Sequence, residues 1–136
     1  MKLIEDIKIN LSADLLKKEY INQNKINPLF GHCYVATETL FYLLNDKDFK
    51  PKRAKDKNNI VHWWLENIKT KEILDVTSEQ YYLVGENPPY KDGKFGGFLT
   101  KLPSKRAEAL IDKIKNNTYW CTKLLTYNVH SCRIKE

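Results

Sequence analysis

Apolar residues recur at helical spacing in two segments of the chain, and each segment predicts a helix. The first helix covers residues 34–44, and its apolar stripe consists of Ala36, Leu40, Leu43 and Leu44. The second begins near Pro103-Ser104 and stops at Asn116-Asn117, and its stripe consists of Ala107, Leu110, Ile111 and Ile114. Cys33 precedes the first stripe by one turn on the same face, so we expect it to point inward at the start of a buried helix.

A shorter helix is predicted nearer the N-terminus, over residues 13–21. Ser12 comes just before this helix, and its side chain can accept hydrogen bonds from the amides of the first turn. The polar residues 22–25 should end this helix, and the residue before a proline, as in Asn27-Pro28, is pushed out of the helical region. A loop is therefore expected to lead into Cys33.

The middle of the chain predicts strands. Residues 60–67 and 72–77 are rich in aromatic and β-branched side chains, and the connection at residues 68–71 suits a hairpin. A further short strand is predicted over residues 49–54, and Pro51 favours its placement at an edge of the sheet. Together with the helices, these strands predict the α+β class, with an N-terminal helix and a cysteine-bearing helix packed on an antiparallel β-sheet.

The hairpin register decides whether two of its polar residues meet. In an antiparallel hairpin the numbers of paired residues have a constant sum, and His62 and Asp75 share a face only if that sum is odd. A two-residue turn at Lys69-Thr70 gives a sum of 139, with Asp75 opposite Trp64 and diagonal to His62. A sum of 137 would place Asp75 directly opposite His62. Either odd register lets the carboxylate reach the imidazole, whereas an even sum would separate them.

Two later segments are less regular. Residues 86–100 form a turn-rich stretch that is interpreted either as a functional loop or lid or as a surface loop without function. Its turn signals are Asn87-Pro88-Pro89, Asp92-Gly93 and Gly96-Gly97. Residues 119–133 alternate loosely between apolar and polar and predict one more strand.

Length and composition favour a single soluble domain. The chain has 136 residues, 42% of them hydrophobic, which suits one modest core over residues 1–136. No apolar stretch approaches the roughly 20 residues needed to span a bilayer, and Glu5 and Asp6 come too early for a secretory signal. We therefore expect a cytoplasmic protein without a membrane partner. Its three cysteines are an odd number outside a secretory context, which favours free thiols.

The charge is positive but does not by itself indicate nucleic-acid binding. Lysine and arginine number 23 against 17 acidic residues, and arginine occurs only at Arg53, Arg106 and Arg133. Reading of bases and phosphates usually recruits arginine for its bidentate fork, so a lysine-rich surface favours a solvated basic face. A nucleic-acid partner remains an alternative that is not favoured.

Three residues have the chemistry of a thiol nucleophile. A cysteine at a helix start benefits from the helix dipole and from a nearby imidazolium, both of which favour the thiolate. In this hypothesis Cys33 is the nucleophile, His62 takes up and returns its proton, and Asp75 orients and stabilises the ring. Amides of the turn before Cys33 are natural oxyanion donors, and the side chain of Asn27 is a further candidate. Each residue also has a plain structural interpretation, as a small core cysteine or a satisfied core histidine.

Neighbouring residues have secondary interpretations. His32 is expected to tune or line the site, and of Trp63 and Trp64 one should fill the core while the other walls the cleft. A zinc site at Cys121, His130 and Cys132 lacks the paired close spacing of familiar structural sites, so neither a metal nor a cofactor is expected.

These motifs resemble a known superfamily. Gly-x-Cys at a helix start, His-x-Trp on a strand and Asp-x-Thr after a hairpin, within residues 27–80, resemble the transglutaminase-like branch of the papain-like cysteine superfamily. The Cys, His, Asp order is also similar to that of small bacterial cell-wall peptidases and arylamine acetyltransferases. The chain is further similar to small bacteriophage proteins that contain a Gly-His-Cys-Tyr motif. The resemblance implies a papain-like core and a cysteine hydrolase or acyltransferase. Asp-Val-Thr replaces the usual Asp-Pro-Thr, and 29 residues is a short separation between Cys33 and His62.

Two functions from different classes follow. The first is a thiol-dependent acyl-transfer enzyme with an acyl intermediate on Cys33, acting on a protein, a peptide or a small amide or thioester. The second is a non-catalytic basic module on the same scaffold that binds a protein or a nucleic acid. The triad leaves open whether water or an amine is the acceptor, and the sequence leaves the oligomeric state open.

Overall fold

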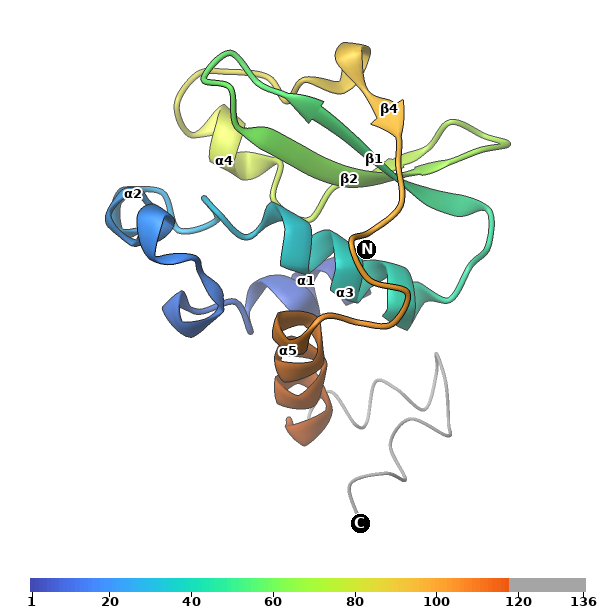
Figure 1. Ribbon diagram of the computed structural model, residues 1–136, viewed down its shortest axis with the longest axis horizontal. Helices are drawn as coiled ribbons and strands as arrows, with labels where there is room; N and C mark the ends of the chain where they lie inside the picture. The colour runs from blue at the N-terminus through green and yellow to red at the C-terminus, as the bar shows by residue number, and fades with distance from the viewer. Residues whose placement is uncertain (118–136) are drawn as a thin grey trace.

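The structure is a computed structural model that describes residues 1–117. Over this range the fold is α+β, as predicted, and its four-stranded antiparallel sheet has the order β3-β2-β1-β4. The strands are β1 (Phe49–Lys55), β2 (Val61–Asn67), β3 (Ile73–Leu74) and β4 (Lys94–Phe95). β1 and β2 form the long central pair, and two-residue strands flank them on either side (Figure 1).

Five α-helices and three 3₁₀ helices accompany the sheet within the described range. The α-helices are α1 (Lys2–Lys8), α2 (Ile21–Ile26), α3 (Cys33–Leu44), α4 (Glu79–Tyr82) and α5 (Lys105–Asn116). The 3₁₀ helices are η1 (Ala13–Leu15), η2 (Lys18–Tyr20) and η3 (Tyr90–Asp92). Figure 1 shows α3 and α1 beneath the sheet, with α5 on the side of α3 away from the strands. The helices predicted over residues 34–44 and after Pro103-Ser104 are confirmed as α3 and α5.

The core forms where α3 meets the sheet, α1 and α5. Its buried members are Leu3, Ile7, Leu15, Val35, Ala36, Leu40, Phe49, Leu65, Leu74, Val76, Ala107, Leu110 and Ile114. The predicted stripe of α5 supplies three of them, and Leu40 of α3 and Leu65 of β2 are fully buried. Burial of such side chains stabilises the fold by about 1.5 to 3 kcal/mol each, so this core holds α3 firmly against the sheet.

The helix predicted over residues 13–21 is wrong. The chain there forms η1 and η2, separated by extended backbone that begins at Leu16. This break lets two adjacent leucines be buried in different places, because Leu15 joins the core while Leu16 packs against Gly31. In a continuous helix the two side chains would point only about 100° apart from the same short segment. Tertiary packing of the two leucines therefore overrode the local helical pattern. The Ser12 side chain caps no amide of η1.

The polar loop predicted over residues 22–25 is also wrong. These residues lie in the short helix α2, which has no buried residue. The side-chain amide of Asn24 donates to the carbonyl oxygens of Pro28 and Phe30, both at 2.8 Å. These bonds organise the approach to α3. The N-terminal helix of the fold is α1, which the sequence analysis did not predict.

The prediction that Pro51 marks an edge strand is wrong, because β1 lies between β2 and β4. The carbonyl oxygen of Pro51 accepts a hydrogen bond from the amide of Gly96, just past β4, at 3.2 Å. In a strand, the N–H and C=O of one residue point to the same side, so the missing amide hydrogen of Pro51 also faces β4. The long β1–β2 pair therefore loses no hydrogen bond, which is why a proline is tolerated inside this sheet.

The hairpin has one of the two predicted odd registers. Leu65 pairs with Leu74 and Glu66 pairs with Ile73, which gives the sum of 139. The side-chain oxygen of Asn67 accepts from the amides of Lys69 and Thr70 and so holds the connection in shape. β3 ends at Leu74, so Asp75 is the first residue after the strand. In this register it lies on the face that carries His62.

Two predicted segments remain. Residues 86–100 contain η3 and β4, so this stretch is partly built into the sheet. The strand predicted over residues 119–133 lies outside the described residues. Among the helices that the structure describes, none is both long and apolar enough to cross a membrane.

A buried carboxylate joins α3 to α5. Glu38 is fully buried, and its two oxygens accept from the backbone amide and from the hydroxyl of Ser104, at 2.8 and 2.7 Å. The Ser104 hydroxyl in turn accepts from the amide of Ala107 and caps α5. One side chain of α3 thus completes the start of the helix that closes the far side of the core.

We expect Glu38→Ala to lower the free energy of unfolding by about 2 kcal/mol or more, because two hydrogen bonds to a charge are lost and buried donors are left unpaired. Urea denaturation measures this loss. The control is Glu72→Ala, which removes an exposed carboxylate from the hairpin connection and should change stability by less than about 0.5 kcal/mol. Equal stability of the two variants would contradict the role given to Glu38.

Candidate active site

A tight turn places Cys33 at the first position of α3. Gly31 has a φ of +85°, a conformation that suits glycine. A Cβ at this position would also lie 2.9 Å from atoms of both Leu16 and Tyr20. Glycine therefore lets the chain pass closely between these side chains and reverse into α3. The predicted position of Cys33 at a helix start is confirmed.

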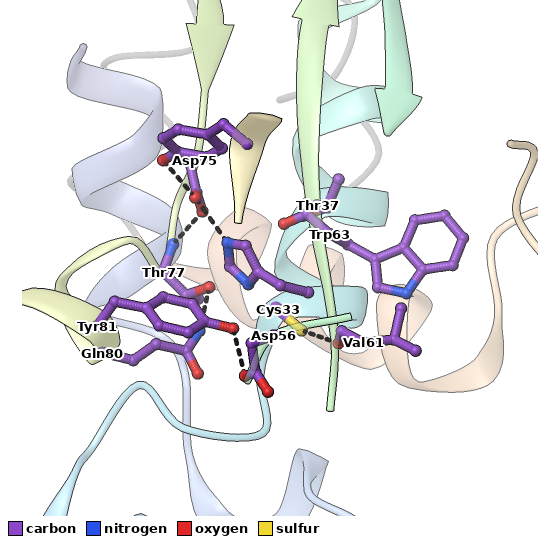
Figure 2. Close-up of polar contacts among 11 residues, drawn as sticks. Cys33, Thr37, Asp56, Val61, Trp63, Asp75, Thr77, Gln80 and Tyr81 are labelled. Carbon is purple, nitrogen blue, oxygen red and sulfur yellow. Dashed lines mark hydrogen bonds and ion pairs between the residues drawn. The ribbon is translucent and has the colours of Figure 1, made fainter. Parts of the chain in front are cut away.

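Cys33 meets β2 along an edge of that strand that has no strand partner. β3 pairs with β2 only at Leu65 and Glu66, which leaves the beginning of β2 open on that side. The thiol of Cys33 donates to the carbonyl oxygen of Val61 at 3.4 Å, and one turn later the Thr37 hydroxyl donates to that of Trp63 at 3.1 Å (Figure 2). Four helical residues advance by about 6 Å and two strand residues by about 6.6 Å, so the spacing of the two side chains on α3 matches that of the two carbonyl oxygens on β2.

The carboxylate of Asp75 holds the ring of His62. Its Oδ2 atom accepts from His62 Nε2 at 2.7 Å and from the Tyr90 hydroxyl at 2.7 Å. Its Oδ1 atom accepts from the backbone amide of Thr77 at 3.2 Å. The side chains of His62 and Asp75 are 0% and 3% exposed. Because three donors converge on it, the carboxylate is fixed in position, and it directs the proton of His62 to Nε2.

The environment of His62 keeps the ring charged. Its ring stacks on Trp64 and meets the edge of Tyr81, at centroid distances of 5.8 and 4.8 Å. Burial lowers the pKa of His62, but the hydrogen bond to Asp75 and the interaction with Cys33 outweigh this and raise the pKa to about 9. Nε2 is engaged by Asp75, whereas Nδ1 is buried and has no hydrogen-bond partner among the described residues, so Nδ1 is the ring nitrogen available to Cys33.

Cys33 opens into a pocket of about 760 Å³. Apolar and aromatic side chains make up much of its wall, including those of Tyr34 and Trp63, whose rings meet edge to face at 4.9 Å. His62 does not line this pocket. Cys33 therefore lies between the pocket on one side and the buried histidine on the other.

The two tryptophans divide as predicted. Trp64 is fully buried and stacks on His62, whereas Trp63 lines the pocket. Two other predictions are wrong. His32 does not line the pocket; the charged groups that affect it are Asp14 and Lys113. The side-chain amide of Asn27 donates to the carbonyl oxygen of Gln80 at 2.8 Å and is thereby engaged.

Two tyrosines belong to the site although sequence reasoning did not single them out. The hydroxyl of Tyr81 donates to Asp56 at 2.8 Å, and that of Tyr90 donates to Asp75. Burial, with the carboxylates next, raises the pKa of both phenols. Tyr90 belongs to the turn-rich residues 86–100, and that turn content was the only signal that pointed to it. This stretch therefore contacts the candidate site through a hydroxyl, which favours the functional interpretation of the loop.

Within residues 1–117, no group of three or more His, Cys, Asp or Glu side chains is placed to hold a metal ion. The zinc candidates Cys121, His130 and Cys132 lie outside the described residues.

No protein family model matches the chain, and no solved structure matches it. The function is therefore argued from the side-chain geometry of Cys33, His62 and Asp75.

We expect Asp75→Asn to lower the pKa of His62 well below about 9, because the carboxylate that opposes the effect of burial is then gone. The ring signals of His62 in an NMR titration measure this. As a control, Asp56→Asn removes a carboxylate that bonds Tyr81 rather than His62, and the ring should still titrate near 9. A His62 pKa that is unchanged in Asp75→Asn would refute the coupling.

His32 should make the free energy of unfolding fall at acidic pH. Burial lowers its pKa to about 4 in the folded chain, while the unfolded chain binds a proton near 6.5. The unfolded state therefore holds more protons between these values, and the free energy of unfolding should fall as the pH drops from 6.5 towards 4. Urea denaturation at several pH values tests this: His32→Gln should flatten this slope, and an equally steep slope in the variant would count against a buried neutral histidine.

Proposed function

We propose that the protein is a thiol-dependent acyl-transfer enzyme in which Cys33 is the nucleophile, His62 the proton carrier and Asp75 the group that orients the ring. The observation that carries the proposal is the 2.7 Å bond between His62 Nε2 and Asp75, behind a cysteine that starts a helix and opens into a pocket. A thiol, a base and a carboxylate that orients the base are the parts of an activated nucleophile.

The reaction follows from the proton positions. Cys33 reacts as a thiolate beside the protonated ring of His62, and the sulfur attacks the carbonyl carbon of an amide or thioester, forming a C–S bond. The tetrahedral intermediate then breaks the bond to the leaving group, which takes the proton from His62. Water or an amine next attacks the acyl sulfur ester, gives a proton to His62 and releases the product. Release of the product leaves the Cys33 thiolate beside the protonated ring of His62, which restores the resting site.

Two features support formation of a thiolate. A His62 pKa raised to about 9 means that the ring holds a proton at neutral pH, and an imidazolium stabilises a neighbouring thiolate. The first turn of α3 adds its dipole, since its amides have no partners within the helix. These amides are also the donors we assign to the developing oxyanion, because the side chain of Asn27 is engaged elsewhere.

The resemblance to the transglutaminase-like branch of the papain-like superfamily supports the same proposal. The described fold has a cysteine-bearing helix against an antiparallel sheet, with the histidine on one strand and the aspartate directly after the next. We infer a papain-like core on this ground, with a protein, a peptide or a small amide or thioester as substrate. Whether hydrolysis or transfer occurs depends on which acceptor reaches the acyl group.

We expect iodoacetamide to label Cys33 at pH 7 at least about tenfold more slowly in His62→Gln than in the parent chain, because the imidazolium that favours the thiolate is gone. Peptide mapping by mass spectrometry reads Cys33 separately from Cys121 and Cys132. The control is His32→Gln, the same substitution beside Cys33 but outside the pocket, with thermal unfolding recorded for both variants.

Equal labelling rates in the parent chain and in His62→Gln would overturn the proposal. They would favour the alternative, a basic binding module on this scaffold, which needs no activated thiol. Steeply salt-dependent binding of DNA or RNA would then identify its partner. An acetyl group found on Cys33 after incubation with phenyl thioacetate, and lost in Cys33→Ala, would instead show the acyl intermediate.

A further inference from the structure

The pocket in front of Cys33 has an unbalanced charge. Its lining contains four cations, Lys17, Arg53, Lys105 and Arg106, and no Asp or Glu side chain. Within residues 1–117, none of the four forms an ion pair. Like charges around one hollow repel each other, and a bound anion relieves that repulsion.

A second pocket shows that this imbalance is not a general property of a basic chain. That pocket, of about 650 Å³, is lined by three lysines and three carboxylates. Two of its members, Lys57 and Glu86, form an ion pair at 3.0 Å. The Cys33 pocket thus has an excess of positive charge that the second pocket lacks.

The arginines make the placement more specific. The chain has arginine at three positions only, and two of them, Arg53 and Arg106, line the pocket. The guanidinium of Arg53 lies over the ring of Trp63, 5.3 Å from its centroid. On another side it lies so close to Gly96 that a Cβ there would be 2.8 Å from Nη1. Its position is thus defined before any ligand binds, and its planar donor fork suits a carboxylate or a phosphate.

We propose that the Cys33 pocket selects an acyl donor that carries an oxyanion group, a carboxylate or a phosphate, beside the reacting carbonyl, and that Arg53 and Arg106 bind this group. The proposal rests on the proposed thiol chemistry for its reaction and deepens it by naming the substrate class. The aromatic wall formed by Tyr34 and Trp63 suits an apolar segment between the anion and the carbonyl.

Two small alkylating reagents test the charge preference without any turnover. Iodoacetate and iodoacetamide both alkylate a thiolate by displacing iodide, and they differ in that iodoacetate carries a carboxylate. The ratio of their rate constants at Cys33, divided by the same ratio for 2-mercaptoethanol, measures the preference of the pocket. We expect this normalised ratio to be about tenfold or more at low salt, as for a ligand drawn to a site of opposite charge.

The variants locate the preference. Arg53→Gln combined with Arg106→Gln should bring the normalised ratio at least about threefold closer to one, and so should about 0.5 M NaCl, which screens exposed charges. The matched control is Lys50→Gln combined with Lys91→Gln. It removes the same charge from exposed positions outside the pocket and should leave the ratio unchanged. Protection of Cys33 by glutarate or by inorganic phosphate then distinguishes a carboxylate from a phosphate ligand.

The outcomes separate the two proposals. A normalised ratio near one in the parent chain, an equal fall in both double variants, or a Cys33 that neither reagent labels would overturn the anion proposal. A raised ratio that depends on the two arginines, together with labelling rates that do not depend on His62, would leave the anion site standing and sink the acyl-transfer proposal.

Discussion

The docking of α3 on the open edge of β2 is the constraint on which the rest of the site depends. Cys33 and Thr37, one helical turn apart, donate to strand carbonyl oxygens two residues apart. These contacts replace a neighbouring strand where β3 is too short to pair, and the buried carbonyl oxygen of Trp63 needs such a partner. A longer β3 would compete for this edge, and Cys33 would lose its position. The position of Cys33 beside β2 therefore depends on the shortness of β3.

The Asp75 carboxylate is the second fixed point, and it joins three segments. His62 comes from β2, Thr77 from the turn after β3, and Tyr90 from the stretch between α4 and β4. A buried charge is costly unless it is hydrogen-bonded, and here three donors meet that need. Because Tyr90 and His62 donate to the same oxygen, movement of residues 86–96 would change the charge that the imidazole senses. The loop is thus coupled to the basicity of His62 by one shared atom.

Sequence reasoning worked where a periodic rule governs the structure. Hairpin parity placed Asp75 on the face of His62, and the register sum of 139 follows from the length of the connection. It did not work where tertiary contacts decide. The separate burial of Leu15 and Leu16 breaks the predicted helix, and Pro51 is tolerated because its missing amide hydrogen faces the two-residue β4. Tyr90 reaches Asp75 across a turn-rich loop, where no periodicity relates sequence distance to contact.

Positive groups lie on both sides of the Cys33 sulfur, and both would favour negative charge beside them. Under the two proposals, the protonated ring of His62 favours a negative sulfur behind Cys33, and Arg53 and Arg106 favour a negative ligand in front of it. A thiolate and an anionic substrate in one pocket would repel each other, and unscreened repulsion at about 4 to 8 Å would slow their encounter. The two arginines would offset that repulsion. The raised pKa of His62 has a separate cause in its interactions with Asp75 and Cys33, so the imidazolium would act on the sulfur while the arginines act on the ligand.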